Sequence, residues 1–137
     1  MPRRRAKDFA YKADVGSIKE FERYGFKAWL THIKKDCSVE ATIRLFAEFI
    51  TFCRKRVDTY ARYTALKILF HVATVDPGVV EKYNQYLHTQ DFKAQTILNR
   101  MDAVQYAIVF IRFNSIYIIY IILASQITIL TLYGLVV

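Results

Sequence analysis

Three histidines and two cysteines are the side chains of this chain best suited to metal or thiol chemistry: His32, His71, His88, Cys37 and Cys53. His32 and Cys37 are close in sequence, but two ligands fall short of the four that a structural zinc site needs. The two cysteines form no Cys-x-x-Cys pair. We therefore predict no metal site, a packed rather than catalytic His71, and two reduced thiols, with Cys53 in the core of a helix.

Sequence motifs of catalysis are also missing. The sequence contains no glycine-rich phosphate loop, no nucleophile elbow and no recognisable pair of catalytic carboxylates. Acidic residues such as Glu20 and Glu22 are explained by helix capping and by charge pairs within helices. We therefore expect a protein that is not an enzyme, with no catalytic residues and no cofactor.

Basic side chains are the remaining candidates for function. The 137 residues carry 20 Lys and Arg against 12 Asp and Glu, a net charge of +8. Such a balance favours a polyanionic partner such as nucleic acid, or an anionic membrane surface. Arg54–Arg56 would be either a solvated helix end or a phosphate contact. Arg3–Arg5 would be a flexible arm on DNA, a solubilising terminus or part of a localisation signal.

Long helices are expected to position these side chains, because four Gly and two Pro leave few turn signals. The clearest helix follows Ser38 as N-cap and ends at Arg56. Its apolar face has helical spacing and consists of Val39, Ile43, Phe46, Ile50 and Cys53. Further helices are predicted from Ser17 to Ile33 with an interruption at Gly25, from Val57 to Thr74 and from Asp76 to His88. A last helix of the body follows the polar connection at residues 89–91 and runs to Ile111. The predicted fold class is therefore all-α, a small helical bundle of four to five helices.

Three segments of this predicted bundle resemble, in the same order, the N-terminal core-binding (SAM-like) domain of tyrosine recombinases and phage integrases. The resemblance covers residues 38–113 and is carried by ATIRLFAEFITFCRKR, by DPGVVEKYNQYLHTQ and by QTILNRMDAVQYAIVFIRF. In that family the first helix usually ends in a basic cluster, the second segment has a proline followed by a tyrosine and leucine pair, and the third is rich in aromatic residues. This domain clamps one face of a DNA duplex, while a separate catalytic domain cleaves the strand.

The resemblance implies a DNA-binding surface. By position, the implied DNA-binding residues are Arg54, Lys55, Arg56, Lys93, Gln95, Thr96, Asn99 and Arg100. The basic members would neutralise phosphates, while Gln95 and Asn99 could offer amide groups to base edges. The family's catalytic His-x-x-Arg element is missing, because the three histidines are followed by Ile-Lys-Lys, Val-Ala-Thr and Thr-Gln-Asp. The resemblance therefore implies a truncated, mobile-element-derived protein without recombination activity.

The C-terminal segment after Arg112 contains no charged residue. Residues 116–137 would form a helix of about 33 Å, enough to cross a hydrocarbon core of about 30 Å. This predicts a C-terminal apolar helix that could be transmembrane, with the basic body on the cytosolic side. Two alternatives remain. The segment has the composition of A/T-rich codons, as in translated intron or intergenic sequence, or it packs onto the body as a helix or strand.

We therefore divide the chain into a basic N-terminal arm (residues 1–16), a helical, core-binding-like domain (17–112) and an apolar tail (113–137). The first functional hypothesis is a non-catalytic module that binds the phosphate backbone of duplex DNA in the nucleus or cytoplasm. The alternative is a tail-anchored, single-pass membrane protein whose basic domain binds a partner or anionic lipid. The oligomeric state is left open.

Overall fold

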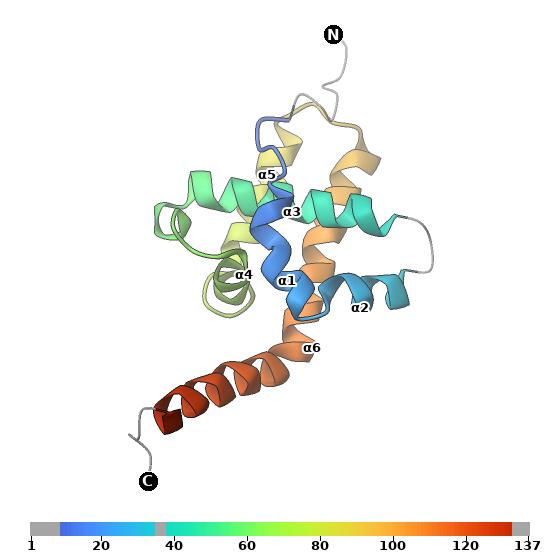
Figure 1. Cartoon of the computed structure of the whole chain (residues 1–137). Coiled ribbons are helices and arrows are strands. Elements are labelled where there is room, and N and C mark those ends of the chain that lie inside the picture. Colours follow the sequence, from blue (N-terminus) through green and yellow to red (C-terminus); the bar gives the residue numbers. More distant parts are fainter. Residues whose placement is uncertain (1–8, 35–37, 133–137) are drawn as a thin grey trace.

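The computed structural model describes residues 9–34 and 38–132, and Arg3–Arg5 and Cys37 lie outside them. The elements are η2 (Val15–Ile18), α1 (Lys19–Arg23), α2 (Phe26–Ile33), α3 (Val39–Arg56), η3 (Asp58–Tyr60), α4 (Ala65–Thr74), α5 (Gly78–His88) and α6 (Ala94–Leu132), where η denotes a 3-10 helix (Figure 1). No strand occurs in the described part of the chain, so the predicted all-α fold class is confirmed.

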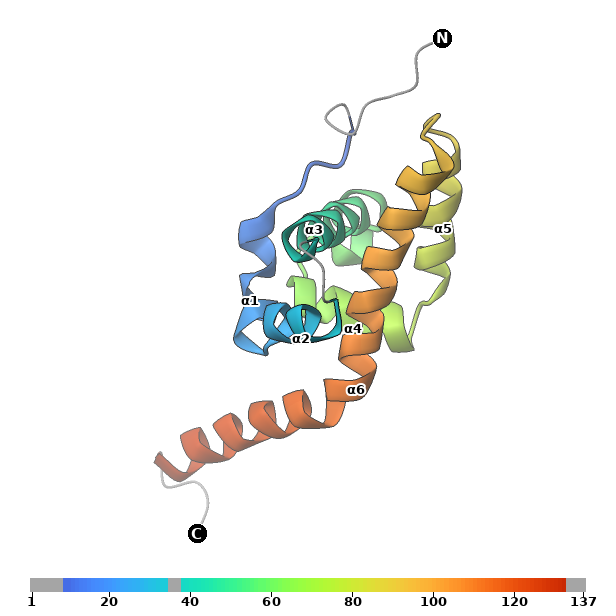
Figure 2. The same ribbon diagram turned by 90° about the vertical axis from the view of Figure 1, so that its right-hand side faces the viewer.

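Helix α3 crosses the middle of the body and makes its most extensive contact with α6 (Figures 1 and 2). All five residues of its predicted apolar face are buried, which confirms the helical spacing seen in the sequence. Cys53 is completely buried, and burial raises the pKa of its thiol. Ser38 occupies the N-cap position as predicted, but its side chain makes no capping hydrogen bond.

A turn at Gly25 divides the first predicted helix into α1 and α2. Gly25 has a φ of 88°, in the left-handed region that only glycine adopts without strain. The chain enters α1 through the 3-10 helix η2 rather than through an α-helix that begins at Ser17. Lys27 of α2 then pairs with Glu40 of α3 at 2.7 Å across the bundle surface.

The prediction of one helix from Val57 to Thr74 was wrong over its first half, because α4 begins only at Ala65. Val57 has an extended backbone, which ends α3. The Arg54 Nε and Nη2 atoms donate to the Tyr63 carbonyl at 3.2 and 3.1 Å and hold the intervening loop. Thr64 then caps α4, since its Oγ1 accepts from the Lys67 N–H at 3.2 Å. His71 of α4 packs edge-on against neighbouring tyrosine rings, as predicted.

Helix α6 is longer than the body that it packs against. Among the α6 residues whose side chains the structure describes, the last buried one is Ile111 and Phe113 is 82% exposed, yet the helix continues through Leu132. The Asn114 side-chain amide donates to the Phe110 carbonyl at 2.9 Å and so competes with the regular helical hydrogen bond. Both views show the later part of α6 bending away from the body (Figures 1 and 2).

The predicted apolar tail is thus helical as far as the structure describes it. The composition change at Phe113 falls inside α6 and coincides with no break in the helix. In residues 9–34 and 38–132, no helix combines the length and apolar character needed to cross a membrane.

Candidate nucleic-acid interface

Arg100 lies in the interior of the body, although the sequence placed it among the surface contacts. The residue is 2% exposed, and its Nε atom lies 3.2 Å from Oε2 of Glu48 on α3. Its guanidinium stands over the rings of Phe9 and Phe92, at 4.9 and 4.8 Å from the ring centres. The ion pair is close but not aligned as a hydrogen bond, and Nη2 of Arg100 has no hydrogen-bond partner among the described residues.

Glu48 is buried as well, although it is not among the five residues of the predicted apolar face of α3. Burial raises the pKa of its carboxyl group, because desolvation disfavours the charged form. The positive charges of Arg100, Arg44 and Lys12 act in the opposite direction without cancelling this effect. Glu48 is therefore a carboxyl group surrounded by cations in a poorly hydrated place.

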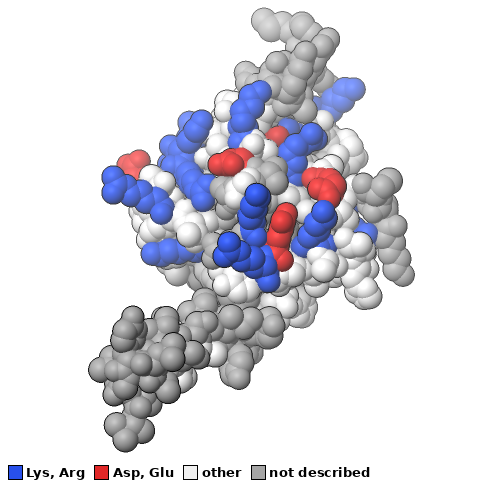
Figure 3. Space-filling model, in the orientation of Figure 1, with Lys and Arg blue, Asp and Glu red and all other residues white. Residues whose placement is uncertain are grey.

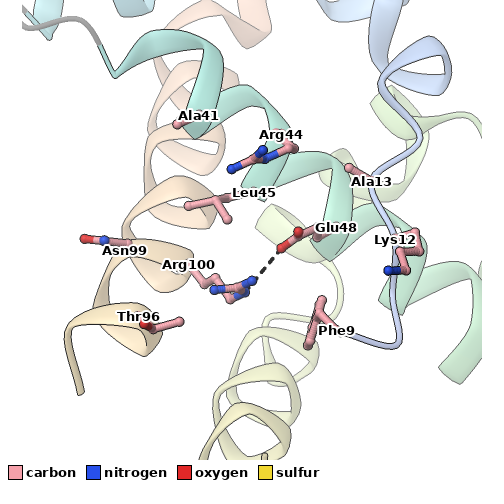
Figure 4. A pocket seen from close by; sticks show the side chains of 10 residues that line it. All are labelled: Phe9, Lys12, Ala13, Ala41, Arg44, Leu45, Glu48, Thr96, Asn99 and Arg100. Atoms are coloured by element: carbon pink, nitrogen blue, oxygen red, sulfur yellow. Dashed lines mark ion pairs between the residues drawn. The ribbon is translucent and has the colours of Figure 1, made fainter. Parts of the chain in front are cut away.

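A pocket of about 560 Å³ opens beside this ion pair, between α3, the start of α6 and the segment 9–13 (Figure 4). We call it the α6 pocket. It is lined by Phe9, Lys12, Ala13, Ala41, Arg44, Leu45, Glu48, Thr96, Asn99 and Arg100. Lys12 and Arg44 are exposed at its rim, whereas Arg100 and Glu48 are buried. The pocket therefore contains three cationic side chains and one carboxyl group.

A second pocket, of about 330 Å³, lies between the end of α3 and α5, and we call it the α5 pocket. Its lining residues are Phe52, Arg56, Val57, Lys82, Gln85, Tyr86 and Thr89. The guanidinium of Arg56 lies 5.4 Å from the ring centre of Tyr86 and 5.9 Å from that of Phe52. These aromatic contacts position the Arg56 charge at the surface, where it and Lys82 are exposed.

The two pockets lie along one side of α3. Five α3 residues each line one of the two pockets. They are spaced by three or four positions and so lie on a single face of the helix: Ala41, Leu45, Glu48, Phe52 and Arg56. We call this line the α3 stripe. Between the pockets, the Tyr11 ring packs against Phe52 and Tyr86 at 5.2 and 5.1 Å. The segment 9–13 therefore lies against α3 and separates the two pockets.

The eight predicted DNA-binding residues fall into two groups, one at the end of α3 and one at the start of α6. At the end of α3, Arg56 lines the α5 pocket, Lys55 is exposed, and Arg54 is engaged with the Tyr63 carbonyl. At the start of α6, Lys93 and Gln95 are exposed, while Thr96, Asn99 and Arg100 line the α6 pocket. Gln95 Nε2 donates to Asn99 Oδ1 at 2.8 Å.

Sequence reasoning did not select three cations that border the pockets, Lys12, Arg44 and Lys82. Helical spacing could have identified Arg44, which lies one turn before Glu48 on α3. Lys12 has no such signal, because only the tertiary packing of the segment 9–13 brings it to α3. Elsewhere, Lys and Arg side chains are spread over the face that shows α1 and α3, with Asp and Glu among them (Figure 3).

In the described residues, no three His, Cys, Asp or Glu side chains lie close enough together to hold a metal ion. Comparisons of the chain with protein-family models, with curated proteins and with solved structures found no match. The resemblance to a recombinase core-binding domain therefore stays a prediction.

Proposed function

We propose that the chain is a non-catalytic, all-helical module that binds duplex DNA through the exposed cations that border the α6 and α5 pockets. One observation carries the proposal: exposed cations from three separate segments border two hollows on the same side of one helix. These cations are Lys12 and Arg44 at the α6 pocket, and Arg56 and Lys82 at the α5 pocket.

The chemistry of the surface suits a phosphate backbone. Duplex DNA carries about one negative charge per 1.7 Å of its axis, so several cations along one line can act together. Arginine and lysine contacts to phosphate fix the position of a protein on the duplex without reading its sequence. The polar side chains at the start of α6, Gln95, Thr96 and Asn99, are placed beside this line and could reach base edges.

Gel retardation of a labelled duplex by the full-length chain, kept in solution with a non-ionic detergent, tests the proposal. The double variant Arg44→Gln/Arg56→Gln removes one exposed cation from each pocket. The matched control Lys19→Gln/Arg23→Gln removes two exposed cations from α1 that line neither pocket. We expect clear retardation by the wild type and the control at low salt, and weaker retardation by the pocket variant.

Two results would contradict the proposal. One is an absence of any retarded complex at low salt. The other is an equal loss in the pocket variant and the α1 control, which would mean that net charge rather than the cations at the two pockets attracts the DNA.

A second candidate function is membrane attachment through the later part of α6. The helix continues past the buried residues of the body, and the described side chains Phe113, Leu123 and Ile127 are exposed there. Exposed apolar side chains on a helix that leaves the body could bind at a lipid surface. Flotation of the full chain with liposomes of neutral lipid, compared with a chain that ends at Arg112, tests this candidate.

A further inference from the structure

We propose that the α6 pocket is a seat for one phosphate group, with Arg44 and Lys12 contacting its oxygens from the rim and Arg100 supplying charge from the floor. The inference rests on the proposed function, since the expected occupant is a backbone phosphate of duplex DNA. A free phosphate or a phosphomonoester has the same recognition chemistry and is distinguished by the experiment below.

The pocket has the walls that such a seat requires. Arg44 and Leu45 come from α3, Thr96 and Arg100 from α6, and Lys12 from the segment 9–13. Arg44 and Arg100 extend into the space from facing helices, with Glu48 beside Arg100 (Figure 4). Its volume of about 560 Å³ lies within the range of ligand-binding pockets, roughly 300–1,000 Å³, and leaves room for a phosphate with its attached sugar.

Arg100 gives the second, independent reason for an anion at this place. A guanidinium has five N–H donors, and a buried cation is costly unless these are satisfied. Here Nε faces Glu48 without hydrogen-bond alignment, and Nη2 is buried without a partner in the described residues. The rings of Phe9 and Phe92 stabilise the charge but accept no conventional hydrogen bond. The site therefore has more positive charge and more donors than Glu48 alone matches.

The charge balance favours an anion in the pocket. Lys12, Arg44 and Arg100 carry three positive charges, and Glu48 supplies one negative charge when it is ionised. A phosphodiester of charge −1 brings the balance closer to zero.

Thermal unfolding of the full-length chain in non-ionic detergent tests the seat. Sulfate and inorganic phosphate serve as probes, each compared with chloride at equal ionic strength. The variants are Arg44→Gln, Arg44→Lys and the control Arg23→Gln, with circular dichroism to verify that each variant is folded. Arg44 and Arg23 are both exposed, so neither substitution disturbs the core.

We expect sulfate and phosphate to raise the Tm of the wild type and of Arg23→Gln more than chloride does. The affinity for either probe should fall by about tenfold or more in Arg44→Gln, because a charge-assisted hydrogen bond is lost. Arg44→Lys should retain part of the effect, since it keeps the charge but not the planar fork. Equal shifts in the wild type and Arg44→Gln, or no difference between sulfate and chloride, would overturn the proposal.

The same variants with duplex DNA and with adenosine monophosphate identify the source of the phosphate. Weaker binding of both DNA and inorganic phosphate by Arg44→Gln supports a backbone phosphate in the seat. Weaker binding of inorganic phosphate and the nucleotide, with unchanged DNA binding, supports a seat for a free phosphate compound. If Arg56→Gln weakens DNA binding while Arg44→Gln alters no probe, the seat is refuted and the proposed function stands. If Arg44-dependent phosphate binding occurs without DNA binding, the proposed function fails and the seat stands.

Discussion

Arg100 and Glu48 connect α6 to α3 through a pair of charges that almost no water reaches. Their side chains are 3% and 10% exposed, so neither charge is screened as it would be at the surface. A buried pair of this kind contributes little net stability compared with an apolar pair, but removal of one partner leaves a charge without compensation. Removal of one partner should therefore destabilise the fold by more than the intact ion pair stabilises it.

Glu48→Leu should lower the free energy of unfolding by about 3–5 kcal/mol, because it leaves the Arg100 charge buried alone. The double variant Glu48→Leu/Arg100→Met removes both charges and should recover much of this loss. Urea unfolding followed by circular dichroism measures both values. A double variant that is as unstable as the sum of its single variants would show that the two charges are not coupled.

Glu48 also predicts a pH dependence of stability. Its pKa is raised by burial in the folded state, so the folded chain holds a proton on this carboxyl group more tightly than the unfolded chain does. The stabilising contribution is complete below the unfolded pKa of about 4.3 and is lost as the pH rises through the raised folded pKa. The Gln side chain of Glu48→Gln does not titrate. The free energy of unfolding of the wild type, relative to that of Glu48→Gln, should therefore fall as the pH rises through the folded pKa of Glu48. Urea unfolding of both proteins across this range measures the difference, and a gain in stability with rising pH would contradict the raised pKa.

At the scale of elements, periodic segments could be predicted from the sequence and locally interrupted ones could not. The face of α3 was predictable because helical spacing of apolar residues directly reflects which side is buried. The loop before α4 was not, because it depends on Arg54 reaching the Tyr63 carbonyl, a tertiary contact that leaves no pattern in the sequence.

The residues of the candidate site were likewise predictable from the sequence only in part. The basic residues at the end of α3 and the start of α6 are clustered in sequence, so they could be selected as candidates. The α6 pocket brings Lys12, Arg44 and Arg100 together from three distant segments, and no spacing in the sequence indicates that they meet. The burial of Arg100 was also unpredictable, because arginine is almost always exposed unless a partner such as Glu48 accompanies it.

The turn between α1 and α2 gives a prediction at this scale. Gly25→Ala should destabilise the body by about 1 kcal/mol, because the φ of 88° is unfavourable for a residue with a Cβ atom. Gly78→Ala is the matched control. Gly78 begins α5, and an added Cβ would be 3.5 Å from its nearest neighbour, an ordinary contact. The control should be neutral or more stable by about 0.4–1 kcal/mol. Urea unfolding measures both, and equal effects would contradict the special role of the Gly25 conformation.

At the scale of the whole molecule, α6 links two regions of different chemistry. Its first part packs in the body and its charged residues end at Arg112, while its later part is uncharged. The electrostatic proposal concerns only the body, so it predicts that DNA binding depends on the pockets and not on the apolar part of α6.

The salt dependence of duplex binding tests the central claim most directly. The logarithm of the association constant of the full-length chain should fall linearly with the logarithm of salt concentration, since each neutralised phosphate releases counterions. Arg44→Gln/Arg56→Gln should reduce the magnitude of the slope by about 2, while Lys19→Gln/Arg23→Gln should leave it unchanged. A slope near zero for the wild type, or the same slope in the wild type and the pocket variant, would contradict the claim that the cations at the two pockets bind DNA phosphates.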